Sequence, residues 1–191
     1  VHYQTVGELR SLQPGDTLGR YELVFPLASG GMGEVWEARF RTAHGFAKTV
    51  ALKTVRSAVE DAKNRTRFLD EARLAAAIDS PFVASIFDFG EHEGTLFLVM
   101  ERLEGVSLSR AIAYNSKLGG AALPPALALR IFADAAVGLH AAHEVRDEGG
   151  TPVELVHRDV APANLLLTAS GVTKVIDFGV AKARGRASPQ T

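Results

Sequence analysis

The sequence predicts an α+β fold of two lobes, in which a five-stranded antiparallel sheet with one helix is followed by a mainly helical lobe. Two observations predict it: strand-like stretches surround a single helical pattern up to residue 101, and helical periodicity prevails after residue 104. The chain has 191 residues, of which 47% are hydrophobic, so it can bury a substantial core. We expect an N-terminal extension at residues 1–20, the first lobe at 21–103 and the second at 104–191.

The strands of the first lobe are expected where β-branched and aromatic residues gather between turn residues, at 21–27, 33–40, 49–55, 82–89 and 95–101. The helix of this lobe is expected at 57–79. Phe68, Ala72 and Ala75 recur there at helical spacing, and Pro81 ends the pattern.

The second lobe is expected to begin with a short helix after Ser107. Paired prolines at 124–125 open a longer helix, which continues to residue 144 and carries one apolar face. Beyond it, two short strands at 165–167 and 173–176 flank a Ser-Gly turn, which predicts a small hairpin.

Composition and charge exclude several classes of function. The chain has no cysteine, which excludes thiol catalysis and cysteine-ligated metals. Its 21 Lys and Arg against 22 Asp and Glu give a formal net charge of -1, so we expect no nucleic-acid partner. No uninterrupted apolar run approaches the roughly 20 residues that span a bilayer, and no signal peptide is visible. We therefore expect a cytoplasmic protein with no membrane contact in this segment.

A glycine-rich turn, ASGGMGEV at residues 28–35, separates the first two predicted strands. Glycines there let backbone N–H groups approach phosphate oxygens closely, although a flexible hairpin would use the same residues. On the third strand, alternation puts Ala51 and Lys53 on one face, beneath this turn. A buried ammonium needs an anionic partner, and Glu71 on the predicted helix is the expected one. A solvated strand lysine is the alternative.

The most specific pattern is HRDVAPAN at residues 157–164 followed by DFG at 177–179. Asn164 and Asp177 offer the oxygen ligands that Mg²⁺ prefers, and the predicted hairpin between them brings the two side by side. Asp159 lies five residues before Asn164, near enough to accept or orient a hydroxyl proton.

These motifs, in this order, resemble those of the protein kinase superfamily. The resemblance runs from residue 21 to residue 182. The GGMGEV wording at 30–35 and Pro162 in the catalytic loop are similar to bacterial relatives of eukaryotic serine/threonine kinases. The resemblance implies a protein-kinase-like fold, ATP and Mg²⁺ as cofactors, and protein substrates phosphorylated on serine or threonine.

The resemblance also implies roles for individual residues. Lys53 would hold the α- and β-phosphates, Glu71 would hold Lys53, and Asp159 would be the catalytic base. Asn164 and Asp177 would bind the metal ions. The nucleotide would be enclosed by residues of the glycine-rich turn, of the strands and of a hinge between the lobes at residues 101–103. These residues are Leu27, Ala28, Gly30, Gly33, Val35, Ala51, Met100, Glu101, Leu103 and Leu166. Ile86, His157 and Phe178 would stack on one another, with Ala75 at the neighbouring helical position.

Three features depart from the family pattern. Ala28 replaces the first glycine of the turn, and Ala161 replaces a lysine that normally supports the γ-phosphate. The sequence stops twelve residues after Gly179, inside what would be the activation segment, so we expect an incomplete second lobe. This stretch of chain is expected to bind nucleotide, to be inactive on protein substrates and to self-associate through the incomplete lobe. Ser188 and Thr191 are candidate phosphorylation sites.

The expected function is transfer of the γ-phosphoryl group of ATP to a protein serine or threonine hydroxyl. An alternative is a pseudokinase or ATP-binding scaffold without phosphotransfer, which Ala161 favours and the intact Lys53, Asp159, Asn164 and Asp177 disfavour. A small-molecule kinase of the aminoglycoside type is disfavoured by the glycine-rich turn and the DFG motif. His140 and His143, three residues apart, are not expected to bind a metal without a third ligand.

Overall fold

The computed structural model describes residues 11–30, 33–42, 45–55, 62–120, 122–147, 149–153 and 155–178. Several sequence predictions lie outside these residues. They are the Gly31-Met32 part of the glycine-rich turn, the first residues of the predicted helix at 57–79, Gly179 of the DFG motif, and the candidate phosphorylation sites Ser188 and Thr191.

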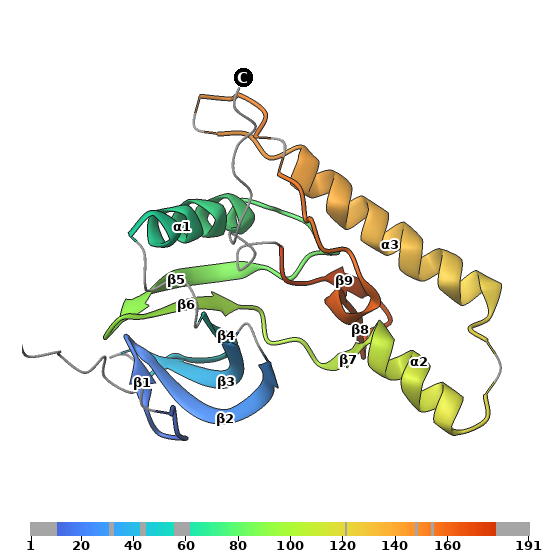
Figure 1. Cartoon of the computed structure of the whole chain (residues 1–191), viewed down its shortest axis with the longest axis horizontal. Helices are drawn as coiled ribbons and strands as arrows, with labels where there is room; N and C mark the ends of the chain where they lie inside the picture. Colours follow the sequence, from blue (N-terminus) through green and yellow to red (C-terminus); the bar gives the residue numbers. More distant parts are fainter. Residues whose placement is uncertain are drawn as a thin grey trace, which may run out of the picture.

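The first lobe is an antiparallel sheet in the order β1-β2-β3-β4-β6-β5 (Figure 1). Its strands are β1 (Thr17–Leu18), β2 (Tyr21–Gly30), β3 (Gly33–Arg41), β4 (Ala47–Val55), β5 (Ile86–His92) and β6 (Thr95–Met100). The five predicted strands are all present, but the sheet has six, which corrects the predicted number. The additional β1 pairs Leu18 with Tyr21 and buries Leu18, and at two residues it is too short to show alternation.

The predicted strand at 82–89 begins later than expected, at Ile86. Val83 instead forms an isolated parallel bridge with Val175 of the second lobe. The Phe82 carbonyl oxygen accepts from the Val175 N–H at 2.8 Å, and the Ala84 N–H donates to the Val175 carbonyl oxygen at 3.0 Å. Residues 82–85 therefore connect the two lobes rather than extend the first sheet.

Helix α1 (Ala62–Ala76) packs beside β5, as Figure 1 shows. Phe68 and Ala72 are buried on its inner face, in a cluster with Leu96 and Leu98 of β6. The helical spacing of the apolar residues in this segment thus predicted its buried side correctly.

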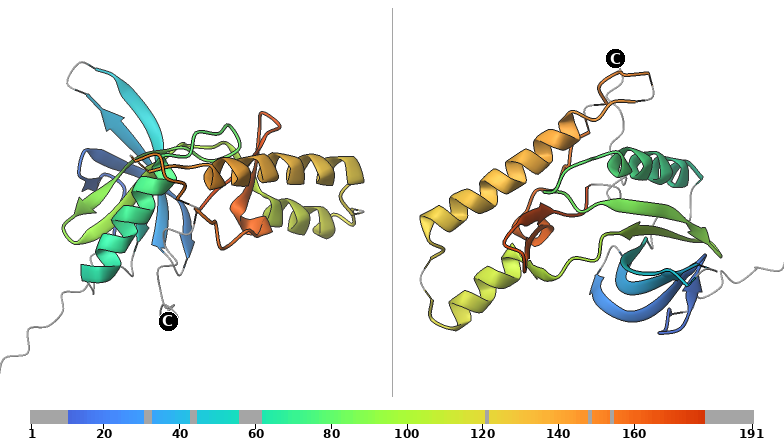
Figure 2. Two further views of the ribbon diagram at one scale, coloured as in Figure 1. Left: turned by 90° about the horizontal axis from the view of Figure 1, so that it is seen from above. Right: turned by 180° about the vertical axis from the view of Figure 1, so that it is seen from behind.

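The second lobe contains β7 (Gly105–Ser107), α2 (Leu108–Lys117), α3 (Pro125–His143), a 3₁₀ turn at Pro162–Asn164, β8 (Leu165–Thr168) and β9 (Thr173–Val175). The predicted hairpin is β8–β9, and β7 adds a third strand that sequence periodicity did not indicate. The Ser107 hydroxyl caps α2 by accepting from the Arg110 N–H at 3.3 Å. In Figures 1 and 2, β8 and β9 lie between α2 and α3.

Helix α3 is 19 residues long with a mean hydropathy of 1.2, so by length and composition alone it meets the criteria for a membrane-spanning helix. A mostly buried core helix of a soluble protein meets the same criteria, and 28% of the apolar window of α3 is buried. On its inner side, Ile131 and Ala135 are buried. Asp134 is also buried there, and its carboxylate accepts from Arg130 Nε at 2.7 Å and from the Thr173 N–H of β9 at 3.0 Å. This polar contact anchors α3 to the sheet of the second lobe.

One apolar cluster extends across both lobes. It joins Val55 and Leu98 of the first lobe to Ile131 and Val175 of the second, and it includes Phe178. The lobes are thus held against each other by a shared core, which gives the cleft between them fixed walls.

Candidate active site

A cleft of about 490 Å³ lies between the lobes. Many of the predicted nucleotide-binding residues line it, namely Leu27, Ala28, Val35, Ala51, Lys53, Met100, Glu101, Leu103 and Leu166, together with Asp177. Gly30, Gly33, Glu71, Asp159 and Asn164 are not part of this lining. Arg102, which lies within the predicted hinge, also lines the cleft, as do Val106, Ser107 and Arg110, which were not predicted.

The walls of the cleft are largely apolar because of strand register. Ala51 of β4 pairs with Met100 of β6, and Val35 of β3 pairs with Lys53. Since side chains two residues apart share a face, Ala51 and Lys53 both point into the cleft, as predicted. Leu166 of β8 forms part of the lining from the other lobe. A slot between apolar side chains of two lobes suits a flat aromatic base.

Gly33 stands where the glycine-rich turn meets β4. Its φ of 137° is a conformation that side chains rarely adopt, and a Cβ atom there would lie 1.9 Å from the Thr54 carbonyl oxygen. The Thr54 hydroxyl accepts from the Glu34 N–H at 3.1 Å on the same side. A glycine is therefore required at this position for the turn to lie close against the strand that carries Lys53.

Lys53 is a buried cation paired with the DFG aspartate. Its side chain is 9% exposed, and its Nζ atom lies 2.6 Å from Asp177 Oδ1. The inward orientation predicted for Lys53 is confirmed, and the solvated alternative is wrong. The pair places an ammonium and a carboxylate together at the inner end of the cleft.

The predicted ion pair between Lys53 and Glu71 does not form in the described part of the chain, and this is a correction. Glu71 Oε1 instead accepts from Arg67 Nε at 3.2 Å and lies 3.8 Å from Arg158 Nη1. Arg67 is one helical turn before Glu71, a spacing that brings side chains together. Among the described residues, Glu71 Oε2 is buried and has no hydrogen-bond partner.

Two residues of the recognised motifs have left-handed backbone conformations. The φ angles are 62° at Arg158 and 60° at Asp177. Such conformations are uncommon outside glycine and persist where the surrounding structure enforces them, often at functional sites. They occur in the HRD and DFG motifs, at the two ends of the segment that also contains Asp159 and Asn164.

The catalytic loop brings Asp159 and Asn164 into direct contact. Asn164 Nδ2 donates to the Asp159 carbonyl oxygen at 2.9 Å and to its Oδ2 atom at 3.1 Å. The Ile176 N–H donates to the Asn164 carbonyl oxygen at 3.0 Å, so the hairpin returns the chain beside Asn164, as predicted. Because both side-chain bonds use Nδ2, the amide oxygen of Asn164 is the atom suited to a hard cation.

His157 is 1% exposed and holds the catalytic loop through hydrogen bonds of its ring nitrogens. Its Nδ1 atom accepts from the Asp159 N–H at 3.2 Å, and its Nε2 atom is 2.9 Å from the Ile176 carbonyl oxygen. These bonds fix the tautomer with the proton on Nε2. The centroids of the His157 and Phe178 rings are 4.6 Å apart and the ring planes are inclined by 59°. The two side chains predicted to stack are therefore in contact, in a tilted arrangement. One histidine thus links the backbones of the HRD and DFG segments.

The hinge residues between the lobes are held by side chains as well as by backbone. Arg102 Nε donates to Glu37 Oε2 of β3 at 2.9 Å, and Arg102 Nη1 donates to the Leu103 carbonyl oxygen at 2.5 Å. The Glu101 N–H donates to the Ser85 carbonyl oxygen at 2.9 Å. The Arg102 side chain therefore links the hinge to β3 of the first sheet.

No group of three or more His, Cys, Asp or Glu residues is arranged to hold a metal within the described ranges. Asn164 and Asp177 remain the predicted metal ligands, and two protein oxygens with phosphate oxygens are a common way to hold Mg²⁺.

The sequence is similar to those of known protein kinases. A family model described as Protein kinase domain matches residues 21–191. Tyrosine-protein kinase MasK of Myxococcus xanthus is 41% identical over 179 residues, which are 92% of this chain and 27% of MasK. Serine/threonine-protein kinase PknD of Mycobacterium tuberculosis is 37% identical over 172 residues, covering 90% of this chain and 24% of PknD. For serine/threonine-protein kinase PknA of M. tuberculosis, the values are 37% over 171 residues, 86% of this chain and 36% of PknA.

Solved structures agree with these relatives. The crystal structure of the M. tuberculosis PknI kinase domain matches with a TM-score of 0.74 at 30% identity, covering 90% of this chain and 64% of that one. A second PknI kinase domain structure gives 0.75 at 30% identity, covering 94% and 66%. The chain thus spans between a quarter and about a third of the length of these curated relatives and just under two thirds of the PknI domains.

Proposed function

The chain belongs to the protein kinase family, and on that premise we propose that it binds ATP with Mg²⁺ in the cleft between its lobes and supports transfer of the γ-phosphoryl group to a serine or threonine hydroxyl of a protein. The observation that carries this proposal is that Lys53 and Asp177 form an ion pair and line one cleft. The hydrogen-bonded Asp159–Asn164 pair adjoins that cleft, because the Asn164 carbonyl oxygen accepts from the N–H of the lining residue Ile176.

The residues of the cleft fit a nucleotide and a divalent cation. A volume of about 490 Å³ is typical of small-molecule sites, which range from ~300 to ~1,000 Å³. Apolar side chains such as Val35 and Leu166 suit the base, and the buried ammonium of Lys53 suits phosphate oxygens. Asp177 and the amide oxygen of Asn164 suit Mg²⁺.

Each residue has a distinct part in the proposed reaction. Bound Mg²⁺ would neutralise the negative charge of the phosphates. Lys53 would bind phosphate oxygens and is already oriented by Asp177. Asp159 would accept the proton of the attacking hydroxyl, and Asn164 would keep the Asp159 carboxylate in place through its Nδ2 bond. Catalysis would come chiefly from positioning and charge neutralisation.

The proposed specificity for serine and threonine rests on the catalytic loop, in which Pro162 resembles the proline found in this loop of serine/threonine kinases. The relatives include proteins named for each specificity, MasK for tyrosine and PknA and PknD for serine/threonine. Phosphoamino-acid analysis of a protein mixture labelled by the natural full-length protein tests this point. We expect phosphoserine and phosphothreonine, and phosphotyrosine alone would refute the proposed specificity.

A second candidate, an ATP-binding scaffold without transfer, is favoured by Ala161, which stands where kinases of this type carry a lysine. The same labelling experiment separates the candidates, with Asp159→Asn as the matched control. Labelled protein that disappears in Asp159→Asn supports a protein kinase. ATP binding without labelled product supports the scaffold, and labelling of a small molecule alone supports a small-molecule kinase.

We further propose that the 191-residue chain on its own binds nucleotide and self-associates, but does not phosphorylate proteins in trans. Leu129 and Phe132 of α3 are 70% and 63% exposed, and apolar exposure of this kind favours association. Sedimentation of the isolated chain tests the association, for which a monomer at all concentrations would be contrary evidence. We also propose a cytoplasmic location. The formal net charge of -1 supports the proposal that the chain has no nucleic-acid partner.

A further inference from the structure

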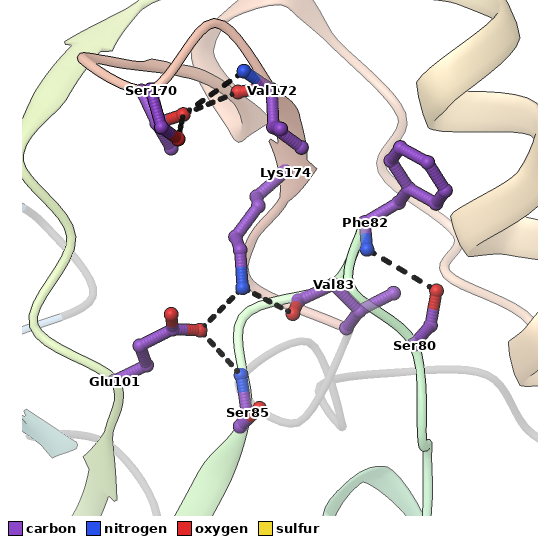
Figure 3. Close-up of polar contacts among 9 residues, drawn as sticks. Ser80, Phe82, Val83, Ser85, Glu101, Ser170, Val172 and Lys174 are labelled. Carbon is purple, nitrogen blue, oxygen red and sulfur yellow. Dashed lines mark hydrogen bonds and ion pairs between the residues drawn. The ribbon is translucent and has the colours of Figure 1, made fainter.

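A polar cluster lies at the hinge, where Lys174 of β9 meets Glu101 and the segment before β5 (Figure 3). Glu101 also lines the cleft, whereas Lys174 does not. Lys174 Nζ of β9 lies 2.6 Å from Glu101 Oε2 and 3.5 Å from the Val83 carbonyl oxygen. Glu101 Oε2 also accepts from the Ser85 N–H at 3.4 Å. The ammonium therefore contacts the hinge and the segment that precedes β5 at the same time.

The position of Lys174 on its strand explains its orientation. Its neighbours Thr173 and Val175 are buried on the opposite face, at 3% and 0% exposure, so Lys174 points toward the hinge. The Lys174 side chain is 14% exposed and that of Glu101 is 30% exposed. A partly buried ion pair is screened less than an exposed one, and loss of one partner leaves the other charge without its counterion.

Backbone bonds on both sides make the cluster a junction of three chain segments. Residues 82–84 pair with Val175 of the second lobe, and the Ser85 carbonyl oxygen accepts from the Glu101 N–H. The Ser80 hydroxyl accepts from the Phe82 N–H at 3.3 Å and holds the preceding turn. Lys174 is the side chain that joins all three segments, and it lies three residues before Asp177.

The hairpin that carries Lys174 is itself closed by side-chain bonds, also visible in Figure 3. The Thr168 hydroxyl donates to the Val172 carbonyl oxygen at 2.7 Å and accepts from the Val172 N–H at 3.2 Å. These bonds fix the register of β8 and β9. Lys174 therefore has a defined position, from which its ammonium can hold the hinge.

We propose that Lys174 is a positioning residue for nucleotide binding, which acts through Glu101 to set the hinge backbone on which the base would lie. This inference rests on the proposed function, because it needs the cleft to bind a nucleotide. Lys174 does not line the cleft, so its effect is indirect. The expected effect is on binding of the base and not of the phosphates, because Lys174 contacts the hinge and does not contact Lys53 or Asp177.

The test is a double-mutant cycle on the affinity of the 191-residue chain for adenosine and for ATP with Mg²⁺, measured by calorimetry. Lys174→Gln should weaken both ligands by the same factor, about tenfold, because a displacement of the hinge by a fraction of an ångström affects the base. Lys174→Arg, which retains the cation, should recover most of the loss. Asp177→Asn should weaken ATP with Mg²⁺ and leave adenosine unchanged.

The double variant Glu101→Gln/Lys174→Gln leaves no unpaired charge, so it should bind adenosine better than the sum of the single losses predicts. If Lys174→Gln does not fold, the adenosine affinity of the double variant is compared with that of Glu101→Gln alone instead. Arg73→Gln, which removes an exposed ion pair with Asp70 on α1, is the matched control and should leave both affinities unchanged.

A lower melting temperature with unchanged adenosine affinity in Lys174→Gln would overturn the inference, because the pair would then be structural only. Additive losses in the cycle would also overturn it. Failure of the unmodified chain to bind either ligand would instead contradict the proposed function, so the two failures are distinguishable.

Discussion

The partner of Lys53 can be determined by two double-mutant cycles on the free energy of unfolding. One cycle combines Lys53→Met with Asp177→Asn, and the other combines Lys53→Met with Glu71→Gln. In the structure Lys53 Nζ is 2.6 Å from Asp177, whereas Arg67 and Arg158 hold Glu71. The first pair should therefore be coupled, and the second should be nearly independent.

The structure gives the expected size of each coupling. Breaking a buried ion pair by removal of one partner costs about 3–5 kcal/mol. The Lys53 side chain is 9% exposed but that of Asp177 is 33% exposed, so we expect the lower part of that range or less, about 2 kcal/mol of coupling. Sites that share no contact add to within about 0.5 kcal/mol, which is the value expected for Lys53 with Glu71.

The assay is urea unfolding of the unmodified chain and the three variants of each cycle, without nucleotide and at low salt. A coupling of Lys53 with Glu71 as large as that with Asp177 would refute the reasoning, because it would mean that Glu71 is the partner after all. Arg67→Met provides a control, since removal of the competing guanidinium should change stability by less than about 1 kcal/mol.

Three further predictions follow from individual contacts. Gly33→Ala should destabilise the chain by about 1–3 kcal/mol and weaken ATP binding, because its Cβ would meet the Thr54 carbonyl oxygen; calorimetry and thermal unfolding measure both, and an unaltered variant would show that the turn can move away. Asp134→Asn should cost about 1–3 kcal/mol in denaturant unfolding, since one buried oxygen that accepts a hydrogen bond becomes a donor. Ala161→Lys should preserve or raise kcat in the natural full-length protein, because an added ammonium would neutralise charge near the γ-phosphate, and a large loss of rate in a folded variant would count against that placement.

The helix and the five longer strands of the first lobe were predictable because their signals are long. Apolar residues at helical spacing gave α1 its correct buried face, and alternation put Ala51 and Lys53 in the cleft. In contrast, β1 and β7 have two and three residues, which is too few for periodicity. Both form because neighbouring strands offer backbone partners, and that is a tertiary effect.

The site shows the same division between local and tertiary information. Sequence order identified Lys53 and Asp177 as site residues, but spacing alone cannot say which carboxylate lies nearest an ammonium. Arg67 could have been noticed as a competitor for Glu71, since four residues separate them on a helix. The contact of Glu71 with Arg158 depends on a left-handed backbone in a distant loop, for which the sequence holds no direct signal.

The measurement that tests the central claim most directly is calorimetric titration of the chain with ATP, with and without Mg²⁺, in the unmodified protein and in Asp177→Asn. The account predicts that Mg²⁺ tightens ATP binding in the unmodified chain and that Asp177→Asn removes most of this gain. ATP affinities that are equal with and without Mg²⁺, or a gain that survives in Asp177→Asn, would contradict it.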